Sequence, residues 1–136
     1  MAERLLADTN VLVRFITGQP AGMAAKARRL IERADRGDFE VEVLPVIVAE
    51  TVYTLESFYE MDRKAVAKSL SHFLRSRGIW PHEKERVLDA LQRFHDQNVG
   101  FADAYLAAGG VETGQRVVSF DRDFEKFKDV TRYEPI

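Results

Sequence analysis

The first apolar and polar positions of the chain predict a buried strand that leads directly into a helix. The apolar run Arg4–Ala7 ends abruptly in an acid, a hydroxyl and an amide, Asp8-Thr9-Asn10, and the apolar pattern resumes over Val11–Ile16. This pattern is typical of a strand followed by a capped helix start. Because ligands of open parallel sheets bind beyond the carboxyl ends of the strands, Asp8 stands where a functional residue is expected.

The rest of the chain alternates between strand and helix patterns. Alternating apolar residues predict strands, and apolar residues three and four apart predict helices. The predicted strands are Arg4–Ala7, Phe39–Leu44 and Gln115–Phe120, with shorter candidates at Gly78–Pro81 and Val130–Tyr133. The predicted helices are Val11–Ile16, Met23–Ala34, Val46–Tyr59, Asp62–Ser76, Glu83–Asp96 and Ala102–Gly109, with a helical turn at Phe124–Phe127. This order predicts one α/β domain over residues 1–136 with a mostly parallel sheet.

The amino-acid composition is that of a globular protein, and it excludes all functions that depend on cysteine. Hydrophobic residues make up 46% of the 136 residues and charged residues 31%, and no apolar run approaches the ~18 residues of a membrane span. The absence of cysteine excludes disulfides, thiolate metal sites and a cysteine nucleophile. There is also no signal-peptide pattern, so the chain is expected in the cytoplasm.

The net charge of −2 means that any nucleic-acid binding would depend on local basic clusters. Each such cluster can equally be a solvated helix face. The clusters are Lys26/Arg28/Arg29, Arg63/Lys64/Lys68 and Arg75/Arg77.

Carboxylates occupy equivalent positions at the ends of several predicted elements. Asp8 follows the first strand and Glu50 comes just after the second. Asp121 and Asp123 follow the last long strand, and Asp103 opens the helix before it. Each acid alone can be a helix cap or a turn former. Because parallel strands end at the same edge of a sheet, these side chains are expected to converge there.

Such a convergence predicts a site for a hard divalent cation. Each pair of like charges at ~4 Å is unfavourable by ~4 kcal/mol at an effective dielectric near ~20, unless an acid takes up a proton or a cation binds. Oxygen-only ligands suit Mg²⁺ or Mn²⁺, which can activate a water and neutralise charge on a phosphate. The histidines His72, His82 and His95 have no ligand spacing and are interpreted as surface or helix-face residues.

Four segments resemble, in order, the motifs of PIN-domain nucleases. Order and length are similar to those of VapC-type toxins of bacterial and archaeal toxin–antitoxin pairs, and the resemblance covers essentially the whole chain. The segments are Leu6-Ala7-Asp8-Thr9-Asn10-Val11-Leu12, Val48-Ala49-Glu50, Phe101-Ala102-Asp103-Ala104-Tyr105-Leu106-Ala107 and Ser119-Phe120-Asp121-Arg122-Asp123-Phe124.

The resemblance implies a three-layer PIN-like fold with a twisted, mostly parallel sheet of about five strands flanked by helices. It also implies a Mg²⁺- or Mn²⁺-dependent endoribonuclease in which a metal-activated water attacks an RNA phosphodiester. By motif, the catalytic and metal-binding acids are Asp8, Glu50, Asp103 and Asp121, with Asp123 as the alternative fourth acid, and the supporting residues are Thr9, Asn10 and Ser119. Asp8 and Asp103 are the expected direct ligands.

The implied partners are an RNA substrate, a cognate antitoxin protein and a second copy of the chain in a homodimer, with no membrane. Three other functions stay open. A phosphatase with Asp8 as nucleophile would need a second acid two residues on, where this chain has Asn10. A PIN-like protein that only binds its partner and a stand-alone RNA-processing nuclease are the others.

Overall fold

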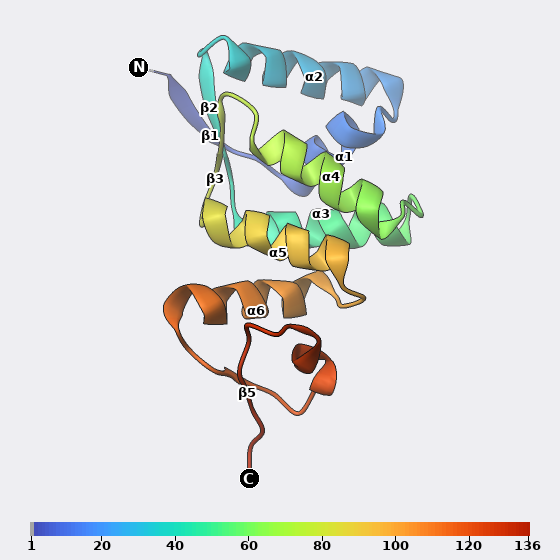
Figure 1. The fold of residues 1–136 in the computed structure, drawn as a ribbon. Coiled ribbons are helices and arrows are strands. Elements are labelled where there is room, and N and C mark those ends of the chain that lie inside the picture. The colour runs from blue at the N-terminus through green and yellow to red at the C-terminus, as the bar shows by residue number, and fades with distance from the viewer. Residues whose placement is uncertain (1) are drawn as a thin grey trace. The chain divides into compact units, whose positions relative to one another are not determined.

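The structure is a computed structural model that describes residues 2–136, and it divides into two compact units. The amino-terminal unit comprises Met1–Lys84 and the carboxyl-terminal unit Glu85–Ile136. Figure 1 traces the elements of both units along the chain. Across residues 2–136, none of the helices has the length and apolar character needed to cross a membrane.

Two strand–helix–helix repeats build the amino-terminal unit (Figure 1). In chain order its elements are β1 Glu3–Leu6, α1 Thr9–Thr17, α2 Ala21–Asp35, β2 Phe39–Val43, α3 Pro45–Ser57, α4 Arg63–Leu74 and β3 Ile79–Pro81. The strands form one sheet in the order β1-β2-β3, and both pairings are parallel. The carboxyl ends of β1 and β2 therefore lie at one edge of this sheet.

Buried and partly exposed residues alternate along β2, so the two faces of this sheet differ in character. Val41 and Val43 are fully buried, on the face where α2 and α4 pack against the strands. The other face carries charged side chains that pair between strands. There Arg4 Nε donates to Glu40 across β1 and β2 at 2.9 Å. One face is solvent-accessible with a polar pair between strands and the other is fully buried and apolar, and this difference fixes the register, because a slip by one residue would exchange the faces.

Local signals in the sequence set the helix ends. Asp62 caps α4, because its side chain accepts a hydrogen bond from Ala65 N at 2.8 Å. Pro45 occupies the first position of α3, where a missing N–H does no harm. Gly78 is required in the turn before β3: its φ is +82°, and a Cβ there would lie 2.3 Å from Ala34 O.

The carboxyl-terminal unit is smaller and mainly helical. Its elements are α5 Lys84–Asp96, which begins at the junction of the units, α6 Phe101–Thr113, β4 Val117–Val118, the 3-10 helix η1 Arg122–Lys126 and β5 Arg132–Tyr133. β4 and β5 pair in parallel. Phe94 of α5 is fully buried with its ring 6.5 Å from that of Phe101 in α6, and Phe124 of η1 is buried as well.

The predicted α/β class with parallel strands is confirmed, but the sheet is smaller than expected. Residues 2–136 contain five strands, yet these form one sheet of three strands and one of two. The predicted strand Gln115–Phe120 is reduced to Val117–Val118, because α6 runs on to Thr113 and the chain turns at Ser119 into η1. The prediction of one domain over residues 1–136 is not tested by the division into units and stays a prediction.

Candidate functional site

Asp8 sits at the turn between β1 and α1, where it caps the helix. Its backbone is extended (φ −88°, ψ 158°), and its Oδ1 accepts a hydrogen bond from Thr9 N at 2.8 Å. Asp8 is exposed, and Asn10 follows at the next exposed position of α1. The carboxylate therefore has the capping role that the sequence allows, while it remains open to solvent for a ligand.

Thr9 links the Asp8 turn to Glu50 of α3. Its hydroxyl is buried at the start of α1 and donates to Glu50 Oε1. Because α1 follows β1 and α3 follows β2, the parallel pairing of these strands brings Asp8, Thr9 and Glu50 to one sheet edge. The structure thus joins three of the predicted site residues within the amino-terminal unit.

Three further acids gather in the carboxyl-terminal unit. Asp103 lies in the first turn of α6 and is only partly exposed. Burial raises the pKa of its carboxyl, and the negative charges of Asp121 and then of Asp123 raise it further. The carboxylates are therefore close enough to repel one another, and both candidates for the fourth acid act on Asp103.

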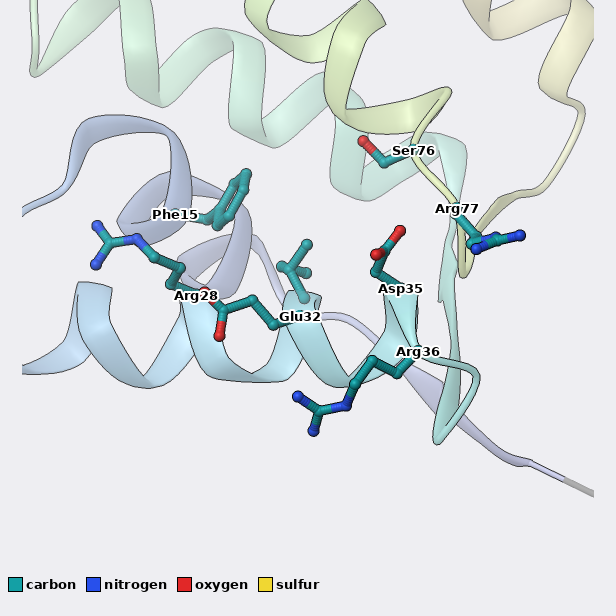
Figure 2. Close-up of a pocket in the computed structure, with 8 residues that line it drawn as sticks. Phe15, Arg28, Glu32, Asp35, Arg36, Ser76 and Arg77 are labelled. Atoms are coloured by element: carbon teal, nitrogen blue, oxygen red, sulfur yellow. The ribbon is translucent and has the colours of Figure 1, made fainter.

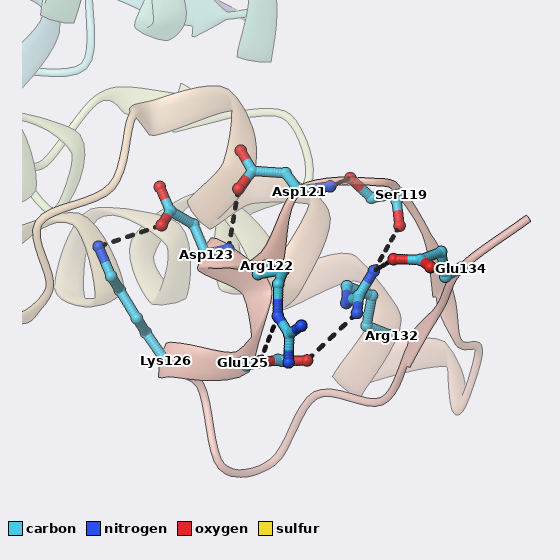
Figure 3. A network of polar contacts seen from close by, with 8 residues as sticks. All are labelled: Ser119, Asp121, Arg122, Asp123, Glu125, Lys126, Arg132 and Glu134. Carbon is cyan, nitrogen blue, oxygen red and sulfur yellow. Dashed lines mark hydrogen bonds and ion pairs between the residues drawn. The ribbon is translucent and has the colours of Figure 1, made fainter.

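Hydrogen bonds hold the loop that carries Asp121 and Asp123 (Figure 3). Ser119 Oγ accepts from Asp121 N at 2.9 Å, and Asp121 Oδ1 accepts from Asp123 N at 2.8 Å. Asp123 also pairs with Lys126 Nζ at 3.4 Å. Asp121 therefore caps η1 by one oxygen, whereas Asp123 is partly neutralised by a cation.

Arg132 supports this loop and was not among the predicted residues. Its guanidinium donates to the carbonyl oxygen of Ser119 at 3.0 Å and pairs with Glu125 and Glu134 at 3.2 and 2.9 Å (Figure 3). These ion pairs raise the pKa of Arg132, most strongly through Glu134. Its side chain reaches back 13 residues to Ser119, so no local pattern marks it in the sequence.

The candidate acids thus form two groups, one in each unit. Asp8 and Glu50 belong to the amino-terminal unit, and Asp103, Asp121 and Asp123 to the carboxyl-terminal unit. Within the described part of either unit, no three acidic or histidine side chains are already arranged as a metal cluster. That the two groups share one pocket stays a prediction.

The donor set nevertheless suits one kind of cofactor. All candidate ligands are carboxylate oxygens, which favour Mg²⁺ or Mn²⁺ over softer metals. Burial first and the charges of Asp121 and Asp123 next raise the pKa of Asp103, and a bound cation would offset the repulsion among these carboxylates. The residues present therefore fit a hard divalent ion.

The sequence matches one known family over most of its length. A family model for the PIN domain matches residues 5–130, a range that includes all five candidate acids. The parallel strands and the helices that follow them make the chain an α/β protein, and the family match assigns it to the PIN type. The chain belongs to the PIN-domain family. PIN domains are generally nucleases and generally use a divalent metal.

One solved structure gives a more distant comparison. It is the crystal structure of VapBC2 from Rickettsia felis bound to a DNA fragment from their promoter. The sequences are 14% identical, the alignment covers 96% of this chain and 97% of that chain, and the TM-score is 0.37. No curated protein sequence matches this chain.

Proposed function

We propose that this protein is a Mg²⁺- or Mn²⁺-dependent endoribonuclease that hydrolyses RNA phosphodiesters. The observation that carries the proposal is the position of the acids: in a PIN-domain chain, Asp8 and Asp121 each cap a helix after a strand, and Glu50 and Asp103 lie in helices beside them. Four such acids act together in the proposed site, with Asp123 as the alternative fourth member.

Asp8 and Asp103 would hold the ion directly, and Glu50 and Asp121 would bind its waters or complete a second site. A bound divalent ion lowers the pKa of a water and stabilises negative charge on a phosphate. The protein's own contribution is positioning. Thr9 fixes the Glu50 carboxylate by a hydrogen bond, and Ser119 shapes the turn that presents Asp121. Burial and the charges of Asp121 and Asp123 raise the pKa of Asp103, and a nearby cation would favour its charged form.

We further propose that the protein acts in the cytoplasm as the toxin of a type II toxin–antitoxin pair, as a homodimer silenced by a cognate antitoxin. The support is the order and length of the motifs, which are similar to those of VapC-type toxins. A stand-alone PIN-domain nuclease and a non-catalytic PIN-like binding protein are the alternatives. Growth arrest on expression that the product of a neighbouring gene suppresses would favour the toxin role over both.

The catalytic proposal is tested by RNA cleavage with Asp8→Asn. Asn caps helices as well as Asp does, so this substitution removes a charge and leaves the helix start intact. We expect cleavage with added Mg²⁺ or Mn²⁺ to fall by ~100-fold or more, since a direct metal ligand is removed. EDTA should abolish cleavage by the unaltered protein.

Asp62→Asn is the matched control for this experiment. It makes the same chemical change at another helix cap, at the start of α4, where no candidate acid lies. We expect its cleavage rate to equal that of the unaltered protein. Equal cleavage by the unaltered protein and Asp8→Asn, or cleavage that persists in EDTA, contradicts the proposal.

A further inference from the structure

A hollow of about 500 Å³ lies in the amino-terminal unit, away from the edge that carries Asp8 and Glu50. The last turn of α2 and residues Ser76 and Arg77 line it, and these segments lead directly into β2 and β3. Since the strands are parallel, the hollow lies at the amino-terminal edge of the sheet. Strand β2, with five residues, spans roughly 15 Å between the two edges.

The rim of the hollow carries three arginines from two distant parts of the sequence (Figure 2). The side chains of Arg28 and Arg77 are exposed and make no hydrogen bond or ion pair with any residue of the described chain 2–136. Arg36 reaches only Asp38, at 3.5 Å. In Figure 2, Arg28 and Arg77 stand on opposite sides of the hollow. These cations are thus available to a ligand.

The floor of the hollow is apolar and carries an aromatic ring. Phe15 of α1 packs against Phe73 with ring centroids 5.4 Å apart and lines the hollow together with the buried Ile31. Guanidinium groups bind phosphate by paired hydrogen bonds, and an apolar floor accepts the face of a base or sugar. Arginine rim and apolar floor together suit a phosphate-bearing ligand.

Charge along the chain points to a polymeric ligand. Residues 26–36 and 75–77 contain seven cations and two acids, although the whole chain has a net charge of −2. These segments hold two of the basic clusters that the sequence shows, and the hollow brings members of both together. A local surplus of cations on an acidic protein favours an extended polyanion, which gains from several phosphate contacts at once.

We propose that this arginine hollow is a secondary binding site for the phosphate backbone of single-stranded RNA. The proposal rests on the proposed endoribonuclease function for the identity of the polyanion. Arg28, Arg36 and Arg77 contact phosphates, while the two acids on the rim, Glu32 and Asp35, oppose binding. Because the hollow lies at the other sheet edge from Asp8, only an RNA long enough to reach both gains affinity from it. The site therefore selects substrates by length.

Binding of a 20-nucleotide single-stranded RNA in EDTA tests the site without any cleavage. We expect the double substitution Arg28→Gln and Arg77→Gln to raise the Kd about 10-fold at ~100 mM salt. The slope of log affinity against log salt should fall by about 1.4, because each single-strand phosphate that a cation neutralises adds ~0.7 to it. Lys64→Gln with Lys68→Gln is the control, because it removes two exposed charges from the first half of α4. The control should leave both quantities unchanged.

A substitution that removes a negative charge from the rim distinguishes a role of the arginines in RNA binding from a role in protein stability. The Glu32 side chain is exposed and makes no hydrogen bond or ion pair within residues 2–136, so Glu32→Gln removes only a repelling charge from the rim. We expect it to tighten RNA binding about 2-fold or more. Equal RNA affinity in the arginine variant and the lysine control overturns the proposal, as does weaker binding by Glu32→Gln.

Cleavage kinetics distinguish this proposal from the proposed function. With a long RNA, the double arginine variant should show a raised KM and an unchanged kcat, and with an RNA of a few nucleotides it should match the unaltered protein. If Asp8→Asn abolishes cleavage while the arginine variant binds normally, the secondary site is wrong and the nuclease stands. If the arginine variant loses binding and no RNA is cut by the unaltered protein, the nuclease is wrong and the binding site stands.

Discussion

Arg93 shows how a single side chain organises the carboxyl-terminal unit. Its side chain is 12% exposed, its Nε donates to Asp89 at 3.1 Å, and its two terminal nitrogens donate to both oxygens of Asp129 at 2.8 and 2.6 Å. The guanidinium also lies 5.4 Å from the centre of the Phe127 ring. It thereby ties α5 to the segment between η1 and β5.

Asp129→Asn should therefore lower stability in a pH-dependent way. The hydrogen bonds from Arg93 lower the pKa of the Asp129 carboxyl. This stabilising contribution is fully present above the unfolded pKa of about 4 and is lost as the pH falls through the lower folded pKa. Asp129 is half exposed, so we expect a loss of about 1 kcal/mol at pH 7, which shrinks at about pH 3. Urea unfolding at both pH values measures it.

Asp89→Asn is the comparison for this substitution. It removes the negative charge from a single i,i+4 contact within one helix, and we expect a loss of about 0.5 kcal/mol at pH 7. Equal losses of unfolding free energy in Asp89→Asn and Asp129→Asn would argue against the bidentate pair between Arg93 and Asp129 as the stabilising feature. A loss in Asp129→Asn that does not change with pH would argue against it as well.

The sequence indicated the roles of residues whose interaction partners lie nearby in the chain. The sequence predicted a helix that begins at Asp62, and in the structure Asp62 caps α4 by accepting a hydrogen bond from Ala65 N, three residues on. The acids at strand ends were likewise chosen from local patterns. Arg93 and Asp129 are 36 residues apart, and nothing near either one indicates the other. Such pairs follow from tertiary packing alone.

The carboxyl-terminal end of helix α6 is another feature that the local sequence does not predict, because tertiary packing sets it. The sequence predicted a helix over Ala102–Gly109, yet the helix continues to Thr113 and ends at Gly114 with φ +72°. Glycine fits at position 110 because the chain returns close to the helix there and leaves no room for a side chain. A Cβ at this position would lie 2.9 Å from Gln115 O and 3.1 Å from a Val117 methyl. This close approach is set by the path into β4, which local periodicity does not encode.

Alanine substitutions at the two glycines should therefore have opposite effects. At Gly109 an added Cβ meets only the Arg86 side chain, at 3.5 Å, so Gly109→Ala should stabilise the protein by about 0.5–1 kcal/mol through helix propensity. At Gly110 it meets backbone that cannot move aside, so Gly110→Ala should destabilise the protein by about 1–3 kcal/mol. Thermal unfolding measures both, and a gain at Gly110 would show that the close approach is not present in solution.

At the scale of the whole molecule, the candidate acids are divided between two units with separate sheets. The sequence predicted the strand ends and helix starts that carry them, since these depend on local patterns. It also predicted a shared pocket from the geometry of one continuous sheet, and the sheets of three and two strands leave that prediction open. The proposed site requires acids of both units to act on one ion, and this requirement can be tested by stability.

Divalent metal should raise the melting temperature, and acids of both units should be needed. An ion that binds only the folded protein stabilises it by about 1.4 kcal/mol at ten times its Kd. For a chain of this size we expect a rise of roughly 4–6 °C in millimolar Mg²⁺ or Mn²⁺. Asp8→Asn and Asp103→Asn should each remove most of the rise, and Asp62→Asn should keep it. A full shift in Asp8→Asn would place metal binding in the carboxyl-terminal unit alone.

The capping role of Asp8 has a practical consequence. Because Asn holds the helix start as Asp does, an Asp8→Asn protein should fold normally while it lacks the proposed nuclease activity. Such a protein could be produced in living cells without harm and crosslinked to the transcripts that it retains. Sequencing those transcripts would then show which RNAs the unaltered protein selects.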